Sequence, residues 1–278
     1  MPELPEVESV KNTLQQLVIG KKIENVIVTY PKLIKKPDDV EIFCDMLREE
    51  IIERIGRRGK FLLLYTTHYT LVSHLRMEGK YRLKAATEAP DKHTHVRFCF
   101  TDGTELRYQD VRKFGTMHLF QKGEEENNLP LVQLGPEPLS EQLTVPYLRE
   151  MVQKSNRNIK SVLLDQHVLV GLGNIYVDEV LFRSRIHPER TAASLLIEEI
   201  NTLHHEIVNT LTEAVEKGGS TIRTYVNSQG KRGTFQQHLL VYGRAGEACS
   251  ACNATIMKTV VSGRGTHYCP VCQQKEKE

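Results

Sequence analysis

Cys249-Ser250-Ala251-Cys252 and Cys269-Pro270-Val271-Cys272 are two Cys-x2-Cys pairs, sixteen residues apart near the end of the 278-residue chain. Two such pairs, each on a tight turn, typically supply four thiolate ligands to a tetrahedral Zn²⁺ site. A segment this short has too little apolar surface to fold without a clamp. Disulfide bonds are the alternative, but the cytosol disfavours them. The spacing predicts one structural zinc ion, held by Cys249, Cys252, Cys269 and Cys272.

The segment around these cysteines is basic. Residues 217–278 contain nine Lys and Arg but three Glu, whereas the whole chain has a net charge of +2. Lys258 and the run Gly263-Arg264-Gly265-Thr266 lie between the two cysteine pairs, and glycines let a backbone approach a phosphate closely. This charge indicates a polyanionic partner; a solvated tail would have the same composition.

The first residues, Met1-Pro2-Glu3-Leu4-Pro5-Glu6, are the second informative stretch. Proline at this position favours removal of the initiator methionine, which would leave a secondary amine on Pro2. An α-amino group has a pKa of about 7.7–8.0, so part of it is a free nucleophile near neutral pH. Glu3 and Glu6 are close enough to act beside it. The same residues also suit the first turn of a helix, with Pro5 at its first position and Glu6 complementing the helix dipole.

Length and composition are those of a globular protein, with room for one large domain or for two to three smaller ones. The chain has 40% hydrophobic and 26% charged residues. No apolar run approaches the ~18 residues of a membrane span, and the N-terminus lacks the basic and then apolar regions of a secretory signal. We therefore expect a cytoplasmic protein with no membrane partner, and nothing in the sequence demands more than a monomer.

The first half of the chain is predicted to be mostly strands. Apolar residues at helical spacing predict a helix over 6–18, and a second short helix is expected over 38–49. Asp102-Gly103 is a strong hairpin signal. Short strands at this spacing are typical of a sandwich or barrel-like β domain. The expected strands are 23–30, 60–65, 70–76, 94–100, 105–108 and 116–120.

The composition changes after Pro130. Residues 135–139 form a Pro/Gly-rich linker, and helical patterns dominate from there to about residue 217. The longest helix is expected to begin near Ser194. Residues 218–238 are polar and glycine-rich, which predicts a loop.

Two further stretches combine glycines with side chains that bind nucleic acids. Residues 169–176 suggest a glycine turn that exposes Asn174 and a helix N-terminus to an anion, although Asn174 could also cap that helix. Residues 110–115 follow a strand and alternate cations with an aromatic residue. Arg112 and Phe114, with Met77, could enter a duplex where a base has been extruded. Taken singly, Met77 and Phe114 would more often be core residues.

Together these stretches closely resemble the formamidopyrimidine-DNA glycosylases, bacterial enzymes that remove 8-oxoguanine and ring-opened purines. The resemblance covers essentially the whole chain. It implies an α+β multidomain fold: an N-terminal β-sandwich with flanking helices over 1–135, a helix–two-turn–helix domain over 136–228, and a C-terminal four-cysteine zinc finger over 238–278. It also implies that the partner is double-stranded DNA containing an oxidised purine or an abasic site.

The resemblance further implies the catalytic residues. Pro2 is the expected nucleophile at C1′ of the damaged nucleotide, with Glu3 as the general acid and Glu6 as a support for the amine. Lys60 is expected at the lesion phosphates with a role in β-elimination. Arg264 is expected to grip the same phosphates and to assist δ-elimination.

Other residues are expected to contact the DNA or the lesion. By the resemblance, Met77, Arg112 and Phe114 fill the vacated stack, with Arg112 facing the orphaned cytosine. A loop over 218–237 is expected to close over the flipped purine. The remaining expected DNA contacts are His74, His93, Asn174, Tyr242 and Lys258, with His95 as an alternative to His93. Lesion recognition is expected from Glu78, Ser220, Thr221, Thr224 and Tyr225.

Two alternatives remain open. Endonuclease VIII-type glycosylases share the fold and mechanism but prefer oxidised pyrimidines, and they typically begin with Pro-Glu-Gly-Pro-Glu where this chain has Leu4. From a different class, a non-catalytic zinc-ribbon DNA-binding protein would explain the cysteines and the basic charge. It would not explain an available amine beside Glu3.

Overall fold

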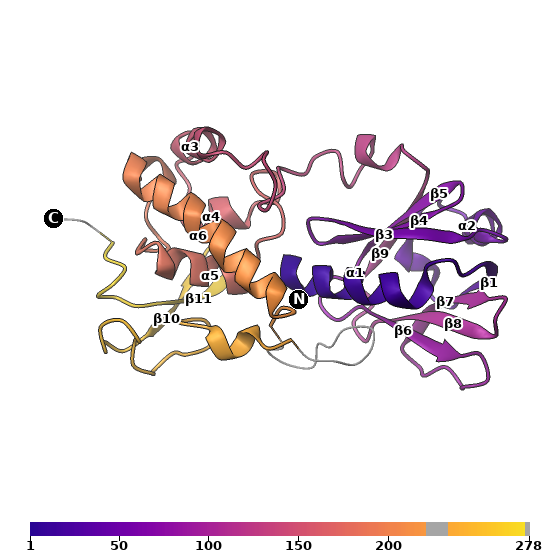
Figure 1. Ribbon diagram of the computed structural model, residues 1–278. Helices are drawn as coiled ribbons and strands as arrows, with labels where there is room; N and C mark the ends of the chain where they lie inside the picture. Colours follow the sequence, from indigo (N-terminus) through magenta and orange to yellow (C-terminus); the bar gives the residue numbers. More distant parts are fainter. Residues whose placement is uncertain (221–232, 276–278) are drawn as a thin grey trace. The chain divides into compact units, whose positions relative to one another are not determined.

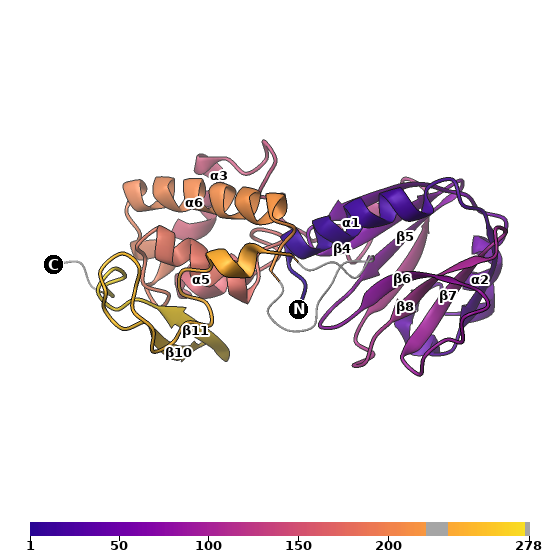
Figure 2. The same ribbon diagram turned by 60° about the horizontal axis from the view of Figure 1, so that its bottom comes forward.

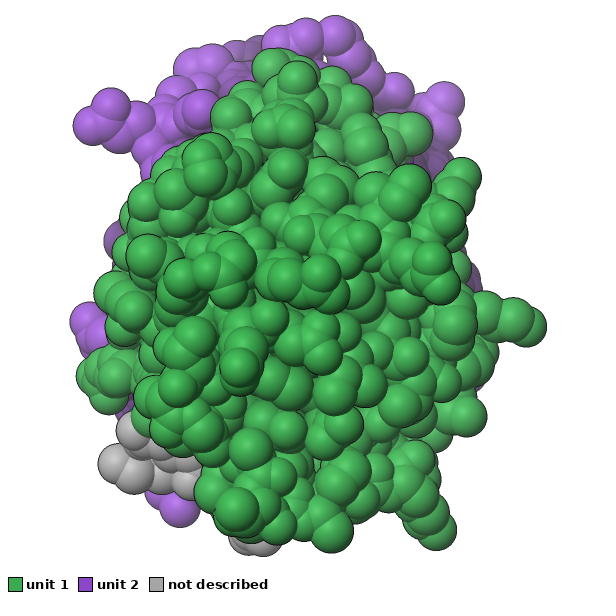
Figure 3. All heavy atoms as spheres, turned by 90° about the vertical axis from the view of Figure 1, so that its right-hand side faces the viewer, with its two compact units in different colours: residues 1–133, 218–233 green, residues 134–217, 234–278 purple. Residues whose placement is uncertain are grey.

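The computed structural model describes residues 1–220 and 233–275. The chain divides into two compact units, coloured separately in Figure 3. Unit 1 comprises residues 1–133 and 218–233, and unit 2 comprises residues 134–217 and 234–278. Residues 218–220 therefore belong with the N-terminal part of the chain, although they follow the last long helix of unit 2.

Unit 1 contains two β-sheets that face each other across a hydrophobic core (Figures 1 and 2). The four-stranded sheet has the order β1-β7-β8-β6, and the five-stranded sheet has the order β2-β9-β5-β4-β3. The strands are β1 (Ile23–Val28), β2 (Ile34–Lys36), β3 (Ile52–Arg58), β4 (Phe61–Thr66), β5 (Tyr69–His74), β6 (Lys80–Ala85), β7 (Thr94–Phe100), β8 (Thr104–Gln109) and β9 (Thr116–Gln121).

Two helices flank these sheets. Helix α1 (Leu4–Val18) packs against β3 and β4, and α2 (Val40–Leu47) packs against β1 and β2. The face of α1 that carries Val7, Val10 and Leu14 is buried in the core, as the helical spacing predicts. Short 3₁₀ helices, η1 (Pro31–Leu33) and η2 (Glu125–Asn127), connect other elements.

Three strands, β2, β3 and β6, were not predicted from the sequence. Each of them lies at the edge of its sheet. Edge strands commonly carry charged side chains, which protect them from pairing with other chains. Arg57 and Arg58 in β3, and Lys80, Arg82 and Lys84 in β6, therefore conceal the alternating hydrophobic pattern that marked the other strands.

Unit 2 is a helical body with a small β-hairpin (Figures 1 and 2). Apolar side chains of its helices form one core, to which α6 contributes Ile200, Leu203, Ile207 and Leu211. The hairpin of β10 (Met257–Val261) and β11 (Arg264–Tyr268) packs against α5. The helices are α3 (Val145–Gln153), α4 (Ile159–Leu164), α5 (Asn174–Arg183), α6 (Ile197–Glu216), η3 (Ala192–Ser194) and η4 (Phe235–His238). No helix in the described part of the chain is long and apolar enough to cross a membrane.

Candidate active site and zinc centre

The amino end of α1 is buried and tied to a distant part of unit 1. Pro2 is buried, and Glu3 and Glu6 are each 2% exposed. The backbone amide of Glu3 donates to Glu6 Oε2 at 2.8 Å. The other carboxylate oxygen, Oε1, accepts from the Ser220 amide at 2.6 Å and from Ser220 Oγ at 3.2 Å. Glu6 thereby fixes residue 3 on one side and residue 220 on the other.

Gly219 is required for this arrangement. Its φ of +80° lies in the left-handed region, and a Cβ at this position would lie 2.6 Å from Glu6 Oε1. Both the backbone conformation and the close approach exclude a larger residue. A glycine at 219 therefore lets the segment before residue 221 lie directly on the Glu6 carboxylate.

Lys60 lies in the turn between β3 and β4 and is 6% exposed. Arg57 fixes this turn to α1, because its Nε donates to Glu8 Oε2 at 2.7 Å and its Nη1 donates to Gly59 O at 3.0 Å. Burial of Glu8 opposes ionisation, but its hydrogen bonds with Lys11 and Arg57 hold the pKa of that carboxyl below its usual value. The helix that bears Glu3 and the turn that bears Lys60 are thus held together by an ion pair.

His74, at the end of β5, is buried beside this turn. Its ring packs edge-on against Phe61, with centroids 4.5 Å apart, and its Nδ1 accepts from the Arg76 amide at 2.9 Å. Burial, and the nearby charges of Arg76 and Lys60, lower its pKa to about 3. The ring is therefore neutral at physiological pH, and with Nδ1 as the acceptor its proton lies on Nε2.

The loop that carries Arg112 and Phe114 is built around Asp110, which is 1% exposed. Asp110 Oδ1 accepts from the Arg112 amide at 3.0 Å, and Oδ2 accepts from the amides of Phe114 and Gly115, both at 2.9 Å. Gly115 has no room for a side chain, because a Cβ there would overlap the Tyr108 hydroxyl. Asp110 begins the stretch that the sequence singles out, but no sequence pattern marks it as the residue that holds the loop.

The side chains of this loop point to solvent. Phe114 is 52% exposed, Met77 is 39% exposed, and the Arg112 guanidinium lies 4.7 Å from the centre of the Phe114 ring. Neither Met77 nor Phe114 belongs to the core, so the core interpretation is wrong for both. Their exposure is consistent with side chains that enter a ligand.

His93 lies just before β7 and His95 lies on it, and of these two histidines only His93 is accessible. His95 is 4% exposed, and its Nε2 lies 2.9 Å from the carbonyl oxygen of Asp110. His93 is half-buried, and its amide donates to Asp91. Of the two rings, that of His93 is therefore the more accessible. Glu78 is also half-buried, whereas Thr221, Thr224 and Tyr225 lie outside the described residues.

The four cysteines of unit 2 lie together. Their sulfur atoms are all within 4.8 Å of one another, with Cys249–Cys272 at 3.9 Å and Cys252–Cys269 at 3.4 Å. Four sulfurs bound to one zinc ion at ~2.3 Å in a tetrahedron are separated by roughly 3.8 Å. Backbone amides of Ala251 and Cys272 also point at sulfur atoms. The donor set and its spacing fit one structural zinc ion.

The finger hairpin is joined to the helices by a buried polar network. The ammonium of Lys160 on α4 contacts Asp178 Oδ1 at 2.7 Å and Thr266 Oγ1 at 2.8 Å, and Asp178 Oδ2 accepts from the His267 amide at 2.8 Å. Asn174 Nδ2 donates to Gly265 O at 2.8 Å. Gly173, not Asn174, is the N-cap of α5, so the capping interpretation of Asn174 is wrong.

The remaining predicted residues of unit 2 lie on this hairpin or pack against it. Tyr242 packs edge-on against His267, and the Tyr242 amide donates to the buried Glu179 carboxylate at 2.8 Å. Lys258 and Arg264 are exposed, and neither side chain has an ion pair or hydrogen bond within residues 1–220 and 233–275. Sequence reasoning missed Lys160, Asp178 and Glu179, because one buried charged residue on a helix gives no recognisable pattern.

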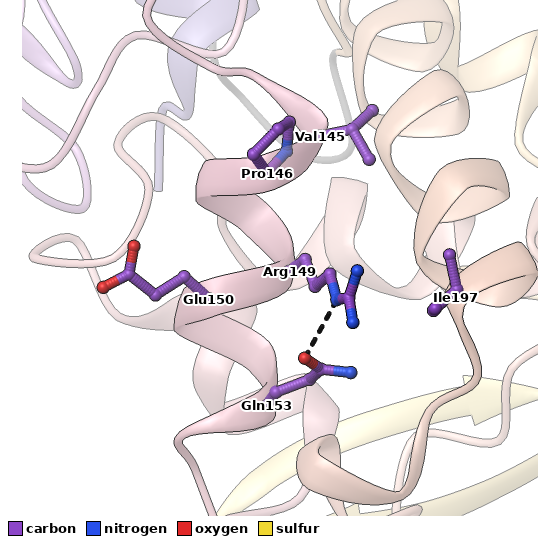
Figure 4. A pocket seen from close by; sticks show the side chains of 6 residues that line it. All are labelled: Val145, Pro146, Arg149, Glu150, Gln153 and Ile197. Carbon is purple, nitrogen blue, oxygen red and sulfur yellow. Dashed lines mark hydrogen bonds between the residues drawn. The ribbon is translucent and has the colours of Figure 1, made fainter.

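Unit 2 also has a separate pocket between α3 and the start of α6 (Figure 4). Its lining combines Val145, Pro146 and Ile197 with a surface hydrogen bond from Arg149 Nε to Gln153 Oε1 at 3.1 Å. None of the residues predicted to act in chemistry or in DNA contact lines it.

Comparison with protein families matches three parts of the chain. A model of the formamidopyrimidine-DNA glycosylase N-terminal domain matches residues 1–117, and a model of the H2TH domain of these enzymes matches residues 134–226. A model of the zinc finger found in FPG and IleRS matches residues 246–275.

Relatives and solved structures agree with these matches. A formamidopyrimidine-DNA glycosylase of Bacillus cereus is 66% identical over 275 residues, which is 99% of this chain and 100% of the relative. That of Halalkalibacterium halodurans is 61% identical over 274 residues, again 99% of this chain and 100% of the relative.

Among solved structures, the Lactococcus lactis Fpg in complex with abasic-site DNA has a TM-score of 0.92 and 44% identity, and the match covers 98% of this chain and 100% of that one. A variant of the same protein with Fapy-dG DNA has a TM-score of 0.93 and 44% identity, over 99% and 100% of the two chains. With family models, full-length relatives and solved structures in agreement, this chain belongs to the formamidopyrimidine-DNA glycosylase family, as a DNA glycosylase with one structural zinc ion.

Proposed function

We propose that the protein excises 8-oxoguanine and formamidopyrimidines from duplex DNA and then cleaves the strand at the resulting abasic site. The observation that carries the proposal is the buried amino end of α1, where Pro2 is buried and Glu6 accepts hydrogen bonds from the amides of Glu3 and Ser220. The relatives are named formamidopyrimidine-DNA glycosylases. These names support purine lesions as the substrate, over the oxidised pyrimidines of endonuclease VIII-type enzymes.

In this proposal the chemistry begins with the Pro2 amine, freed by removal of Met1. The amine attacks C1′ of a nucleotide that has been flipped out of the duplex. The bond between C1′ and the base breaks, the base leaves with a proton, and Glu3 donates a proton to the sugar ring oxygen as the ring opens. The product is an iminium ion between Pro2 and the opened sugar.

This iminium has no proton on nitrogen to lose, so it acts as an electron sink. Loss of a C2′ proton converts the iminium to an enamine, and the enamine electrons then break the C3′–O bond and expel the 3′ phosphate. Loss of a C4′ proton then breaks the C5′–O bond in a second elimination, and water releases the sugar fragment from Pro2. The DNA is left with a one-nucleotide gap, and no step needs a catalytic metal ion.

Charged and polar side chains would hold the DNA during these steps. We assign Lys60 and Arg264 to the phosphates that flank the lesion, because oriented cations there stabilise the departing phosphates. His74 would donate from Nε2 to a phosphate without adding charge. Exposed Met77, Arg112 and Phe114 would occupy the stack that the flipped base vacates. The remaining proposed DNA contacts are His93, Asn174, Tyr242 and Lys258.

The zinc ion has a structural role in this scheme. Bound to four thiolates it has no open position for a substrate, and it would hold the hairpin on which Arg264 and Lys258 lie. Residues 218–237 are proposed to close over the flipped purine, with Glu78, Ser220, Thr221, Thr224 and Tyr225 in lesion recognition. Because chromosomal DNA is the proposed substrate, we also propose a cytoplasmic location at the nucleoid. We further propose that the protein acts as a monomer.

Borohydride trapping tests this proposal. Reduction of the iminium on a duplex with 8-oxoguanine opposite cytosine should give a stable cross-link, and peptide mapping should locate it at Pro2. A duplex with an oxidised pyrimidine serves as the competing substrate. A cross-link at a lysine, or fully active protein that retains Met1, would refute the role of Pro2. Preferential trapping on the pyrimidine duplex would instead place the protein with the endonuclease VIII-type enzymes.

A further inference from the structure

The turn of the finger hairpin has an unusual residue at its tip. Val261 pairs with Arg264, so Ser262 and Gly263 form a two-residue turn between β10 and β11. Their φ angles are 49° and 74°, and two positive values are typical of a type I′ turn. Asn-Gly and Gly-Gly suit such a turn, because glycine adopts the left-handed conformation without steric cost and asparagine tolerates it better than most residues with a side chain. Ser262 occupies a position that an asparagine or glycine would occupy at lower conformational energy.

The Ser262 hydroxyl has a use that offsets this conformational cost. Its Oγ lies 2.8 Å from Ser161 Oγ and accepts from Asn158 Nδ2 at 3.0 Å. Asn158 is also the N-cap of α4, since its Oδ1 accepts from the Ser161 amide at 2.8 Å. We call these three residues, Asn158, Ser161 and Ser262, the turn clasp. It attaches the tip of the hairpin to the first turn of α4.

The backbone is held just as firmly on the other side of Arg264. Gly265 O accepts from Asn174 Nδ2 at 2.8 Å and from Lys160 Nζ at 3.2 Å. The Lys160–Asp178 ion pair behind it is fully buried. Arg264 therefore lies between two attachment points, while its own side chain is exposed and has no partner in the described residues.

This placement matters because an isolated two-stranded hairpin is only marginally stable in water. An arginine side chain has several rotatable bonds, so the direction of its guanidinium depends first on where its backbone is held. A displacement of about 1 Å is enough to impair a catalytic contact. With Lys160 and Asn174 alone, the hairpin would be held on the β11 side of Arg264 and free to fray at the turn.

We propose that Ser262 is a positioning residue for Arg264, and that the turn clasp fixes the guanidinium for the second elimination at the lesion. The inference rests on the proposed function of Arg264. The clasp does not touch the reacting atoms, so it has no part in formation of the Pro2 iminium. Its removal changes how far the strand reaction proceeds, and not whether the covalent intermediate forms.

The clasp can be removed without unfolding the finger. Ser262→Gly deletes the hydroxyl and suits the positive φ, so the turn itself gains stability. Ser161→Ala deletes the opposite hydroxyl at a helical position where alanine is favourable, and Asn158 continues to cap α4. Changes at the buried Lys160–Asp178 pair would leave an unpaired buried charge and destabilise the fold, so they are unsuitable for this test.

The test uses full-length, zinc-loaded protein and a duplex with a single abasic site. Both variants should slow the second elimination by about threefold to tenfold, the effect of losing one or two hydrogen bonds. The rate of borohydride trapping and the zinc content should equal those of the wild type. The double variant should be no slower than either single variant, since both remove the same contact.

Ser161→Thr keeps the hydroxyl, so its second elimination should proceed at the wild-type rate. Ser250→Ala removes an exposed hydroxyl elsewhere on the finger and serves as the control.

Arg264→Ala in the same assay separates the role of Arg264 from the role of the turn clasp. If Arg264→Ala leaves the second elimination unchanged, the proposed role of Arg264 is wrong. If Arg264→Ala slows it but Ser262→Gly and Ser161→Ala do not, the turn clasp does not position Arg264 and the inference is overturned. It is also overturned if the clasp variants slow trapping as much as the second elimination, or if they lose zinc, because the clasp is then only structural.

Discussion

The Ser220 amide donates a hydrogen bond to Glu6 Oε1 at 2.6 Å, across 214 residues of sequence. The same carboxylate accepts from the Glu3 amide through its other oxygen. One side chain thereby joins the amino end of α1 to the residues that lead into the 221–232 segment. A change at either partner should affect the other, because a buried carboxylate that loses a donor is left with an unsatisfied oxygen.

Gly219→Ala should disrupt this contact, and Gly218→Ala provides a matched control. Both glycines have positive φ, 80° and 71°, so alanine is disfavoured at both. Only at 219 would the new Cβ meet Glu6, at 2.6 Å from Oε1; at 218 the nearest atom is 3.8 Å away. We expect both variants to lose stability by roughly 1 kcal/mol from the backbone alone. Gly219→Ala should in addition lose trapping activity on 8-oxoguanine duplexes, and equal activity of the two variants would show that the Glu6 contact is dispensable.

Glu3→Gln should abolish base excision while DNA binding persists. The amide keeps the shape of the buried side chain but cannot donate the proton, and general acid catalysis is typically worth ~10²–10⁴-fold. A duplex with a preformed abasic site needs no cleavage of a base, so its processing should fall much less. Single-turnover rates on the two duplexes give the comparison. Equal loss on both would mean that Glu3 also acts in the elimination steps.

The sequence suggests candidate catalytic residues, but it does not indicate the contacts that hold them in place. Interior strands such as β7 show an alternating pattern and were predicted, whereas edge strands such as β3 carry charges and were missed. The zinc ligands are visible because all four are close in sequence. The bond between Glu6 and Ser220 joins residues too far apart for any spacing rule, and a loop as irregular as residues 218–220 has no periodicity that could indicate its partner.

Asp110→Asn should weaken binding to lesion DNA by loosening the loop that carries Arg112 and Phe114. Asp110 accepts three backbone amides through its two oxygens. An amide group in place of one oxygen would direct its own N–H at a backbone donor. Hydrogen bonds to a charged group contribute ~1.5–3 kcal/mol, so the dissociation constant should rise by roughly tenfold or more.

The exposed Asp45 on α2 provides an Asp45→Asn control with unchanged affinity. Phe114→Ala, measured in parallel, calibrates the effect of losing the loop's aromatic side chain. If Phe114→Ala weakens binding and Asp110→Asn does not, the loop keeps its conformation without the carboxylate.

His74 should make the protein less stable in mild acid. Burial and the charges of Arg76 and Lys60 lower its pKa to about 3, against an ordinary value of 6.5. Between these two values the unfolded chain takes up a proton that the folded chain does not, so the free energy of unfolding falls as the pH decreases. The limiting slope for one such group is ~1.4 kcal/mol per pH unit.

His74→Asn keeps an acceptor for the Arg76 amide and removes the titrating ring. Urea unfolding between pH 7 and pH 5 should therefore show a shallower loss of stability for this variant than for the wild type. His205→Asn, at an exposed position of α6, is the control. If the wild type and His74→Asn lose stability in parallel, His74 is not held neutral by its surroundings.

Cys252→Ser should impair DNA binding through the finger and leave the helical core of unit 2 folded. Serine is a poor replacement for a zinc thiolate, and the finger has only a small apolar cluster, formed by residues such as Ile256 and Val241, to hold it together without the metal. Lys258 and Arg264 would lose their fixed positions. The affinity for lesion DNA in low salt should fall, and its dependence on salt should flatten, because fewer phosphates are neutralised.

Cys44→Ser, at a half-buried cysteine of α2 in unit 1, is the matched control and should keep both the zinc content and the salt slope. If Cys252→Ser loses zinc yet binds lesion DNA with the affinity and salt slope of the wild type, the hairpin cations do not contact the phosphates, and the assignment of Arg264 is wrong.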